Sequence, residues 1–159
     1  MKFSNGYWLT KEGVTLAAPE DIRDIEVSDG KLIVYAATRP IRHRGDTLEG
    51  PILTFEYSSP FPEVISVKAR HFMGTDEKGP SFELYEEEGF MPEISQSDDQ
   101  IILKSGRLSM TVKRTPGWAM EFLYDGKYIT GNTRRDTAYL TVAGDGAYMR
   151  ERLELGVDE

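Results

Sequence analysis

Apolar and polar residues alternate along much of the chain, in short blocks that Gly, Pro, Asn or Asp residues separate. Such alternation is typical of half-buried β-strands, because successive side chains of a strand point to opposite faces of its sheet. The spacing typical of amphipathic helices is almost absent. The pattern therefore predicts an all-β fold in which the strands form one antiparallel, two-layer β-sandwich.

Turn residues between the alternating blocks predict three hairpins. The clearest has Ile25-Glu26-Val27 before the turn and Leu32, Val34 and Ala36 after it, because Asp29-Gly30 supplies the positive φ that a tight turn requires. The other two lead from Ile101–Lys104 through Ser105-Gly106 to Leu108, Met110 and Val112, and from Met120, Phe122 and Tyr124 through Asp125-Gly126 to Tyr128-Ile129.

The longest predicted strand covers Val64–Phe72. Its residues divide cleanly between two faces, with Ile65, Val67 and Ala69 on one and Ser66, Lys68 and Arg70 on the other. Helix competes with strand at Pro19–Val27, where Pro19 suits a first helical position, but strand is favoured. Gly74–Met91 is rich in Gly, Pro and Glu and predicts a long loop with one short strand around Phe82–Leu84.

Length and charge limit the classes of function. A chain of 159 residues has the size of one domain, so residues 1–159 are expected to form a single domain. The net charge of −8 repels nucleic-acid backbones and anionic lipid surfaces, so neither nucleic acid nor a membrane is an expected partner. No apolar run is typical of a signal peptide or a membrane span, so a cytoplasmic location is expected. The chain has no cysteine, which excludes disulfides but leaves the redox compartment undetermined.

Candidate chemistry is sparse. Histidine is the usual general base, and the chain has His43 and His71. His71 ends the predicted strand, where a hydrogen-bonded structural role is favoured over catalysis. His43 lies in Arg42-His43-Arg44, where a basic surface turn, or ion pairs with acidic neighbours, is favoured over a functional site.

Carboxylates are numerous but have no spacing that indicates a site. Neighbouring carboxylates on a strand or loop point in different directions, so Glu86-Glu87-Glu88 and Asp98-Asp99 are interpreted as solvated surface. Asp136 and Asp145 are expected in turns, and Arg44-Gly45-Asp46 is also interpreted as a turn. No residue is assigned a catalytic, cofactor-binding or metal-binding role, and no cofactor is expected.

Aromatic residues leave sugar binding open as an alternative function. Trp8, Trp118, Tyr7, Tyr124 and Tyr139 would form a sugar-stacking platform if they were exposed. Aromatic residues in alternating strands are more often part of the core, which is the favoured interpretation here.

The order of several segments resembles the amino-terminal domain of glycoside hydrolase family 31, in particular its bacterial α-xylosidase branch. The matching interior segments are Gly6–Leu9, Val34–Arg39, Arg42–Arg44, Gly50–Thr54, Ser59–Gly74, Lys104–Ser109 and Gly126–Gly131. The sharpest match is the tail, Tyr148–Glu159. Asp158 departs from the family pattern, and the segment 132–146, taken as a loop, matches no relative, so its role is left open.

The resemblance implies a galactose-mutarotase-like supersandwich and a supporting role. In this family two aspartates of a (β/α)8 barrel perform a retaining mechanism, and both would lie beyond Glu159. The chain would then be a non-catalytic amino-terminal domain of an enzyme that hydrolyses terminal α-xylosyl, or α-glucosyl, residues of an oligosaccharide substrate. Its implied partner is the catalytic barrel of the same parent chain.

Two other functions stay open at this point. One is a free-standing carbohydrate-binding module, and the other is a protein-interaction sandwich that binds a partner through an exposed edge strand. The resemblance also implies that further strands of the sandwich follow this segment. A sheet edge would then be left unpaired, which predicts self-association.

Overall fold

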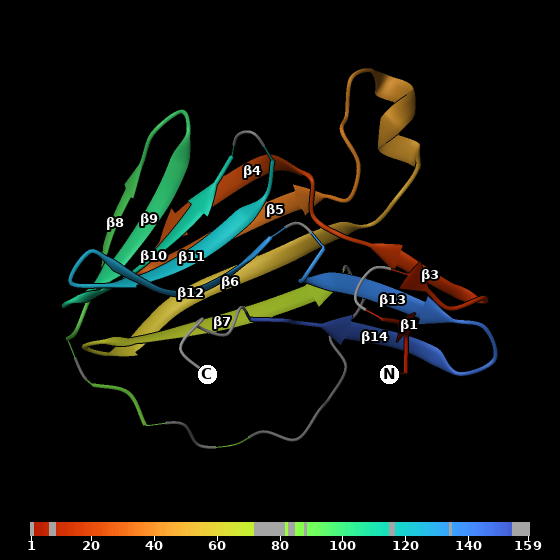
Figure 1. The fold of residues 1–159 in the computed structure, drawn as a ribbon. Coiled ribbons are helices and arrows are strands. Elements are labelled where there is room, and N and C mark those ends of the chain that lie inside the picture. The colour runs from red at the N-terminus through yellow and green to blue at the C-terminus, as the bar shows by residue number, and fades with distance from the viewer. Residues whose placement is uncertain are drawn as a thin grey trace.

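The computed structural model describes residues 2–6, 9–71, 82, 85–87, 89–114, 117–133 and 135–153. The architecture is all-β, with four antiparallel sheets, and it confirms the predicted β-sandwich (Figure 1). One short 3-10 helix, η1 (Arg44–Leu48), lies in a connection between two strands. No helix of the described residues has the length and apolar character needed to cross a membrane.

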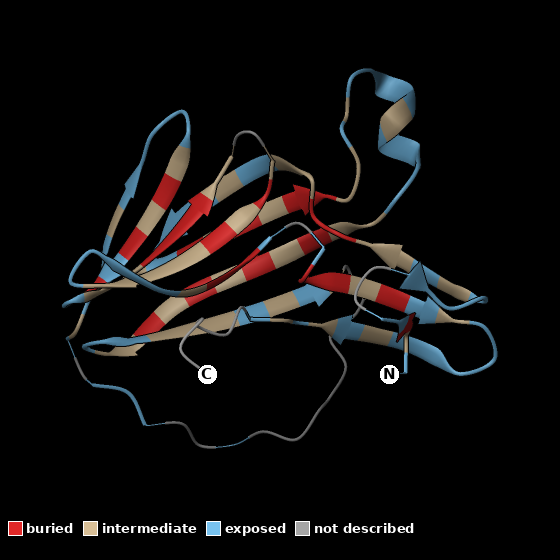
Figure 2. Ribbon diagram, viewed as in Figure 1, coloured by how far each residue is buried: buried red, intermediate tan, exposed pale blue. Residues whose placement is uncertain are grey.

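One layer of the sandwich is a four-stranded antiparallel sheet in the order β4-β5-β6-β7. Its strands follow one another along the chain and form a meander: β4 (Asp21–Ser28), β5 (Lys31–Ala37), β6 (Ile52–Phe61) and β7 (Val64–His71). Along β6 every second residue from Leu53 to Ser59 is buried, and Figure 2 shows this alternation as bands. The alternation turns one face of the sheet toward the interior.

The other layer is a five-stranded antiparallel sheet in the order β12-β11-β10-β9-β8. Its strands are β8 (Glu93–Gln96), β9 (Gln100–Ser105), β10 (Leu108–Lys113), β11 (Ala119–Tyr124) and β12 (Lys127–Thr133). It is a meander as well, so every neighbouring pair is joined by a short turn.

The core lies between these two sheets. Its buried members are Leu32, Val34, Ala36, Leu53, Phe55, Tyr57, Ile101, Leu103, Met110, Val112, Trp118 and Met120. The rings of Phe55 and Trp118 join the layers, with centroids 4.5 Å apart. Burial of apolar side chains from both layers stabilises the sandwich, at roughly 1.5–3 kcal/mol for a fully buried large side chain.

A smaller three-stranded sheet adjoins the sandwich near one edge of the four-stranded sheet (Figure 1). Its order is β14-β13-β3, with β3 (Val14–Ala17), β13 (Ala138–Val142) and β14 (Gly146–Arg150). Tyr139 of β13 packs against the main core. Two short strands, β1 (Ser4–Asn5) and β2 (Leu9–Thr10), pair near the amino terminus.

All three predicted hairpins are confirmed. Ser28 pairs with Lys31 across the first turn, and Asp29 and Gly30 both adopt positive φ, at 50° and 71°. Two consecutive positive φ values suit a two-residue hairpin turn, which explains why Asp-Gly is informative here. Ser105 pairs with Leu108, and Tyr124 pairs with Lys127, across the other two turns.

The prediction of the longest strand was wrong. The predicted strand at 64–72 exists as β7, but β6 is longer, with 10 residues against 8. Ser58-Ser59-Pro60 resembles a break in the sequence. The strand continues through it because the register shifts between Ser58 and Phe61, and such an irregularity tolerates a proline that has no N–H to donate.

Three further predictions have mixed outcomes. Pro19–Val27 contributes to strand β4, which confirms strand over helix. The segment 132–146 is not a loop, because it contains β13, the central strand of the three-stranded sheet. The predicted short strand at Phe82–Leu84 falls largely outside the described residues, as does much of the predicted loop 74–91.

Candidate functional site

The first candidate is a cleft of about 450 Å³ between β7 and the three-stranded sheet. The rings of His71 and Tyr139 stack across this junction, with centroids 4.1 Å apart and planes inclined by 9°. The lining residues are Ala69, Arg70, His71, Tyr139, Ala147, Tyr148 and Met149. These described residues are aromatic, aliphatic or, in Arg70, cationic, and none of them is a carboxylate, so the cleft suits binding of an apolar or ring-shaped group more than acid–base chemistry.

A second cleft, of about 270 Å³, lies at the other end of β7, where the chain enters β8. We call it the acidic cleft, and it is lined by Asp29, Gly30, Lys31, Ser58, Ser59, Pro60, Glu86, Glu87, Gly89, Phe90, Met91 and Pro92. A hydrogen bond from Glu87 N to Pro60 O (2.9 Å) holds the 85–92 segment against the end of β6. Glu86 and Glu87 are exposed, so their carboxylates form a solvated rim rather than a buried reactive pair.

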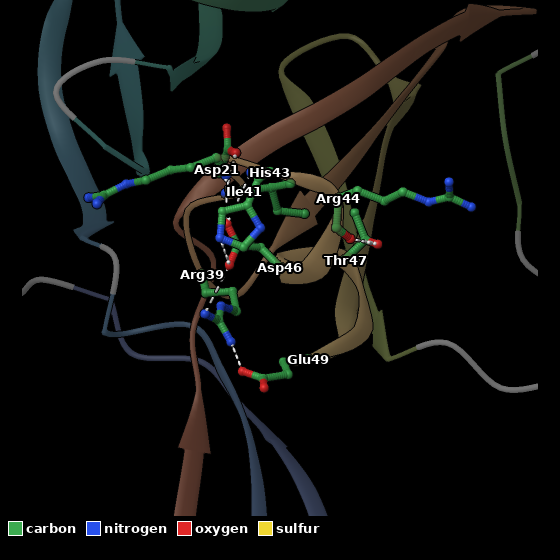
Figure 3. A network of polar contacts seen from close by, with 9 residues as sticks. Asp21, Arg39, Ile41, His43, Arg44, Asp46, Thr47 and Glu49 are labelled. Atoms are coloured by element: carbon green, nitrogen blue, oxygen red, sulfur yellow. Dashed lines mark hydrogen bonds and ion pairs between the residues drawn. The ribbon is translucent and has the colours of Figure 1, made fainter.

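The third feature is the connection 38–51 between β5 and β6, which contains η1 and projects beyond the sheets (Figure 1). Asp46 organises it (Figure 3). One carboxylate oxygen accepts hydrogen bonds from Arg42 N (2.9 Å) and His43 N (3.2 Å), and the other lies 3.4 Å from the Arg39 guanidinium. Arg39 also pairs with Glu49, so the two ends of the connection are joined.

The environment of Asp46 favours its charged form. The hydrogen bond from Arg42 N is the largest cause that lowers the pKa of this carboxyl below its ordinary value, with further contributions from His43 N and from the charges of Arg39 and Arg42. The His43 ring lies 3.5 Å from the same carboxylate. The connection is therefore shaped by electrostatics and hydrogen bonds, since η1 buries none of its residues.

A fourth feature is a polar cluster, where the five-stranded sheet meets the three-stranded one, in which the buried Asn132 and Thr137 contact the partly exposed Glu151. The Asn132 side-chain amide donates to Thr137 Oγ1 (2.9 Å) and to Glu151, and Thr137 Oγ1 donates to Glu151 Oε2 (2.6 Å). Burial raises the pKa of Glu151, Asp136 adds to the rise, and the two hydrogen bonds oppose it. The cluster ties β12 to the chain on both sides of the β13–β14 hairpin.

The two histidines have structural surroundings. His43 lies on the surface beside Asp46, which confirms the predicted ion-paired turn. His71 ends β7 as predicted, and its ring stacks on Tyr139; among the described residues it makes no hydrogen bond of the kind predicted. The structure does not bring the two together, because they belong to separate features of the fold.

The acidic and aromatic candidates also lie in separate parts of the fold. Asp98 and Asp99 are exposed, and Asp136 and Asp145 lie in turns as predicted. Within the described part of the chain, no three His, Asp or Glu side chains are grouped so that they would hold a metal ion. Trp118 is part of the core, whereas Tyr7 and Trp8 lie outside the described residues.

Two features were not predicted from the sequence. The polar cluster of Asn132, Thr137 and Glu151 joins residues up to 19 positions apart, and only the pairing of strands brings them together. Asp46 was interpreted as part of a turn, which is correct, but not as its organiser. The signal available was an aspartate four residues after Arg42 and seven after Arg39, in a segment with little apolar content.

Comparison with known proteins extends these observations. The chain matches none of the protein-family models. It is 33% identical to the α-xylosidase XylQ of Lactiplantibacillus pentosus, over 100% of this chain and 21% of that protein. It is 28% identical to an α-xylosidase of Emericella nidulans, over 99% of this chain and 20% of that protein.

The chain thus spans about a fifth of the length of the curated relatives it matches. A match that includes all of one chain and a domain-sized part of a much longer one is what a shared domain produces. The predicted resemblance is confirmed: the chain is related over its whole length to one part of the α-xylosidases of glycoside hydrolase family 31, as an amino-terminal domain of such an enzyme would be.

Proposed function

We propose that residues 1–159 form a single, non-catalytic amino-terminal domain of a retaining glycoside hydrolase that removes terminal α-xylosyl, or α-glucosyl, residues from oligosaccharides. The observation that carries the proposal is that two α-xylosidases match the whole chain with only a fifth of their own length. The catalytic (β/α)8 barrel would belong to the rest of the parent chain and would be the main partner of this domain.

The role of the domain would be to support the barrel and its subunit contacts. Retaining hydrolysis needs two carboxyl groups about 5–5.5 Å apart on either side of the scissile bond. The described residues that line the cleft between β7 and β14 include no carboxylate, and the described acidic residues of the other cleft lie on an exposed rim. These arrangements favour support over catalysis.

The test assays release of xylose from an aryl α-xyloside by this chain, by the separately expressed remainder of its parent polypeptide, and by a mixture of the two. Activity is expected only in the mixture, or only when the two parts are co-expressed. Activity of this chain alone would overturn the proposal, and so would full activity of the remainder without it.

A second candidate function is carbohydrate binding by this domain. The observation that favours it is the aromatic lining of the cleft at β7 and β14, to which His71, Tyr139 and Tyr148 all contribute rings. Calorimetric titration with xylose and xylo-oligosaccharides tests it. Binding that Tyr148→Ala removes would support a site in this cleft, and absence of heat at millimolar sugar would exclude it.

Two further expectations stay proposals. We propose a cytoplasmic location, for which the acidic composition, with a net charge of −8, is the support. We also propose that the chain self-associates. Its sheets end in edge strands such as β7 and β12, on which Val64, Tyr128 and Ile129 are exposed apolar side chains. Light scattering over a wide concentration range tests self-association.

A further inference from the structure

The projecting connection between β5 and β6 ends in an apolar knob. Leu48, the last residue of η1, is 88% exposed, which is the highest value among the large apolar side chains of the described residues. The knob is held in place: Asp46 binds the backbone of Arg42 and His43, and Thr47 Oγ1 donates to Arg44 O (2.7 Å). A connection that is internally braced but buries nothing of its own is pre-organised for contact with another surface.

Two arginines accompany Leu48. Arg42 and Arg44 are exposed, and no ion pair between described residues includes either guanidinium. Figure 3 shows Arg44 directed away from the network around Asp46. Because the whole chain carries a net charge of −8, this place is a local cationic spot on an acidic molecule. We call Arg42, Arg44 and Leu48 the tip.

The acidic cleft has the complementary character. Pro60, Phe90, Met91 and Pro92 give it apolar walls, Asp29, Glu86 and Glu87 place carboxylates at its rim, and Lys31 is the one cation among its described lining residues. Tyr85, at the edge of the same segment, is 82% exposed and stacks on Phe61. An apolar side chain between two cations is complementary in charge to a cleft that has apolar walls and more carboxylates than cations.

The tip does not face the acidic cleft of its own chain. The acidic cleft includes Asp29-Gly30, the turn before β5, whereas the connection that bears the tip follows Ala37 at the other end of that strand. A strand of this length, 7 residues, separates its ends by about 20 Å at 3.3 Å per residue. Figure 1 likewise places η1 and the β4–β5 turn at opposite ends of the four-stranded sheet.

We propose that the tip of one copy inserts into the acidic cleft of a second copy. Leu48 would occupy the space beside Phe90 and Met91, while Arg42 and Arg44 would pair with Glu86 and Glu87. The contact joins two different surfaces, so it is head-to-tail, and repeated contacts close into a ring or continue as a filament. The inference deepens the self-association proposed above and does not depend on the glycosidase role.

The test measures association by sedimentation velocity at low ionic strength, for wild type and for variants of each surface. Leu48→Asp, R42E/R44E and E86K/E87K are each expected to weaken association by about tenfold or more, because like charges then face one another. The control for R42E/R44E, with the same change in charge, is K11E/K104E, which changes two exposed lysines outside both surfaces and outside β7 and β12, and it is expected to associate as the wild type does. Circular dichroism and thermal unfolding verify that every variant is folded.

Reversing the charges on both surfaces gives the decisive test. The fourfold variant R42E/R44E/E86K/E87K is expected to regain self-association, because its tip and acidic cleft are again complementary. R42E/R44E mixed with E86K/E87K is expected to associate as alternating copies although neither variant associates alone, because the tip of each variant is opposite in charge to the 86–87 side chains of the other. A strictly monomeric wild type overturns both this proposal and self-association. If R42E/R44E and Leu48→Asp are folded and associate as strongly as the wild type, this contact is overturned but self-association is not.

Discussion

Two carboxylates of this protein have similar numbers of polar partners, yet the pKa of one is lowered and the pKa of the other is raised. Asp46 accepts two backbone hydrogen bonds and lies beside an arginine, and its pKa is lowered. Glu151 accepts hydrogen bonds from Thr137 and Asn132 in the polar cluster, yet its pKa is raised. The difference lies in the balance of causes. At Glu151 desolvation is the largest cause and, with the negative charge of Asp136, it outweighs the two hydrogen bonds; at Asp46 the hydrogen bond from Arg42 N outweighs desolvation, and His43 N and the charges of Arg39 and Arg42 add to it.

The two carboxylates therefore affect stability with opposite pH dependence. The lowered pKa of Asp46 contributes stability that is present above the ordinary Asp value and is lost as the pH falls through the folded-state value. The raised pKa of Glu151 contributes stability that is complete below the ordinary Glu value and is lost as the pH rises through the folded-state value. Substitutions at each site separate the two effects.

The largest effect is expected at Thr137, which is completely buried and joins Asn132 to Glu151. Thr137→Val keeps the shape but removes the hydroxyl, which leaves the buried Asn132 amide without one acceptor, and we expect a loss of about 1–3 kcal/mol in the free energy of unfolding. Urea denaturation measures it.

Thr111→Val is the matched control, because Thr111 is also buried but its hydroxyl belongs to no hydrogen bond reported between described residues. We expect a change smaller than that of Thr137→Val. Equal losses in the two variants would mean that the polar cluster contributes nothing beyond packing.

An intermediate effect is expected for Glu151→Gln, which removes the cost of burying a charge. Relative to this variant, the wild type should become more stable as the pH falls from about 8 to about 4, because Glu151 binds a proton more tightly in the folded state. Denaturation curves at several pH values measure the difference. A flat difference, or one with the opposite slope, would contradict the assignment of Glu151 as a destabilised charge.

The smallest effect on global stability is expected for Asp46→Asn, because the connection 38–51 lies outside the core. The wild type should lose its advantage over this variant as the pH falls below about 3.9, which is the reverse of the trend at Glu151. Amide hydrogen exchange at Arg42 and His43 should accelerate, since both N–H groups lose their charged acceptor.

Asp98→Asn serves as the control for this last comparison, because Asp98 is an exposed aspartate outside the connection. It should leave the exchange rates at Arg42 and His43 unchanged. If Asp46→Asn also leaves them unchanged, the carboxylate does not organise the connection, and the pre-organised tip loses its physical basis.

Local chemistry made much of the sheet architecture predictable. Asp29-Gly30 and Asp125-Gly126 provide positive φ values at the turns, so their flanking strands were identified without knowledge of the fold. β6 was not recognised as the longest strand because Pro60 and two serines resemble a break, and only pairing with β7 through a register shift carries the strand past them. The segment 132–146 was interpreted as a loop because its short strand β13 is recognisable only when β3 and β14 flank it.

The sequence by itself determined the all-β class, the hairpins and the relation to α-xylosidases, because alternation, turn residues and segment order are properties of neighbouring residues. The tertiary structure alone decided which polar groups meet: Asn132 and Glu151, His71 and Tyr139, and the residues of each cleft. Those contacts depend on how sheets pack and register across long separations. Such packing is fixed by the burial of the whole apolar core rather than by any local pattern.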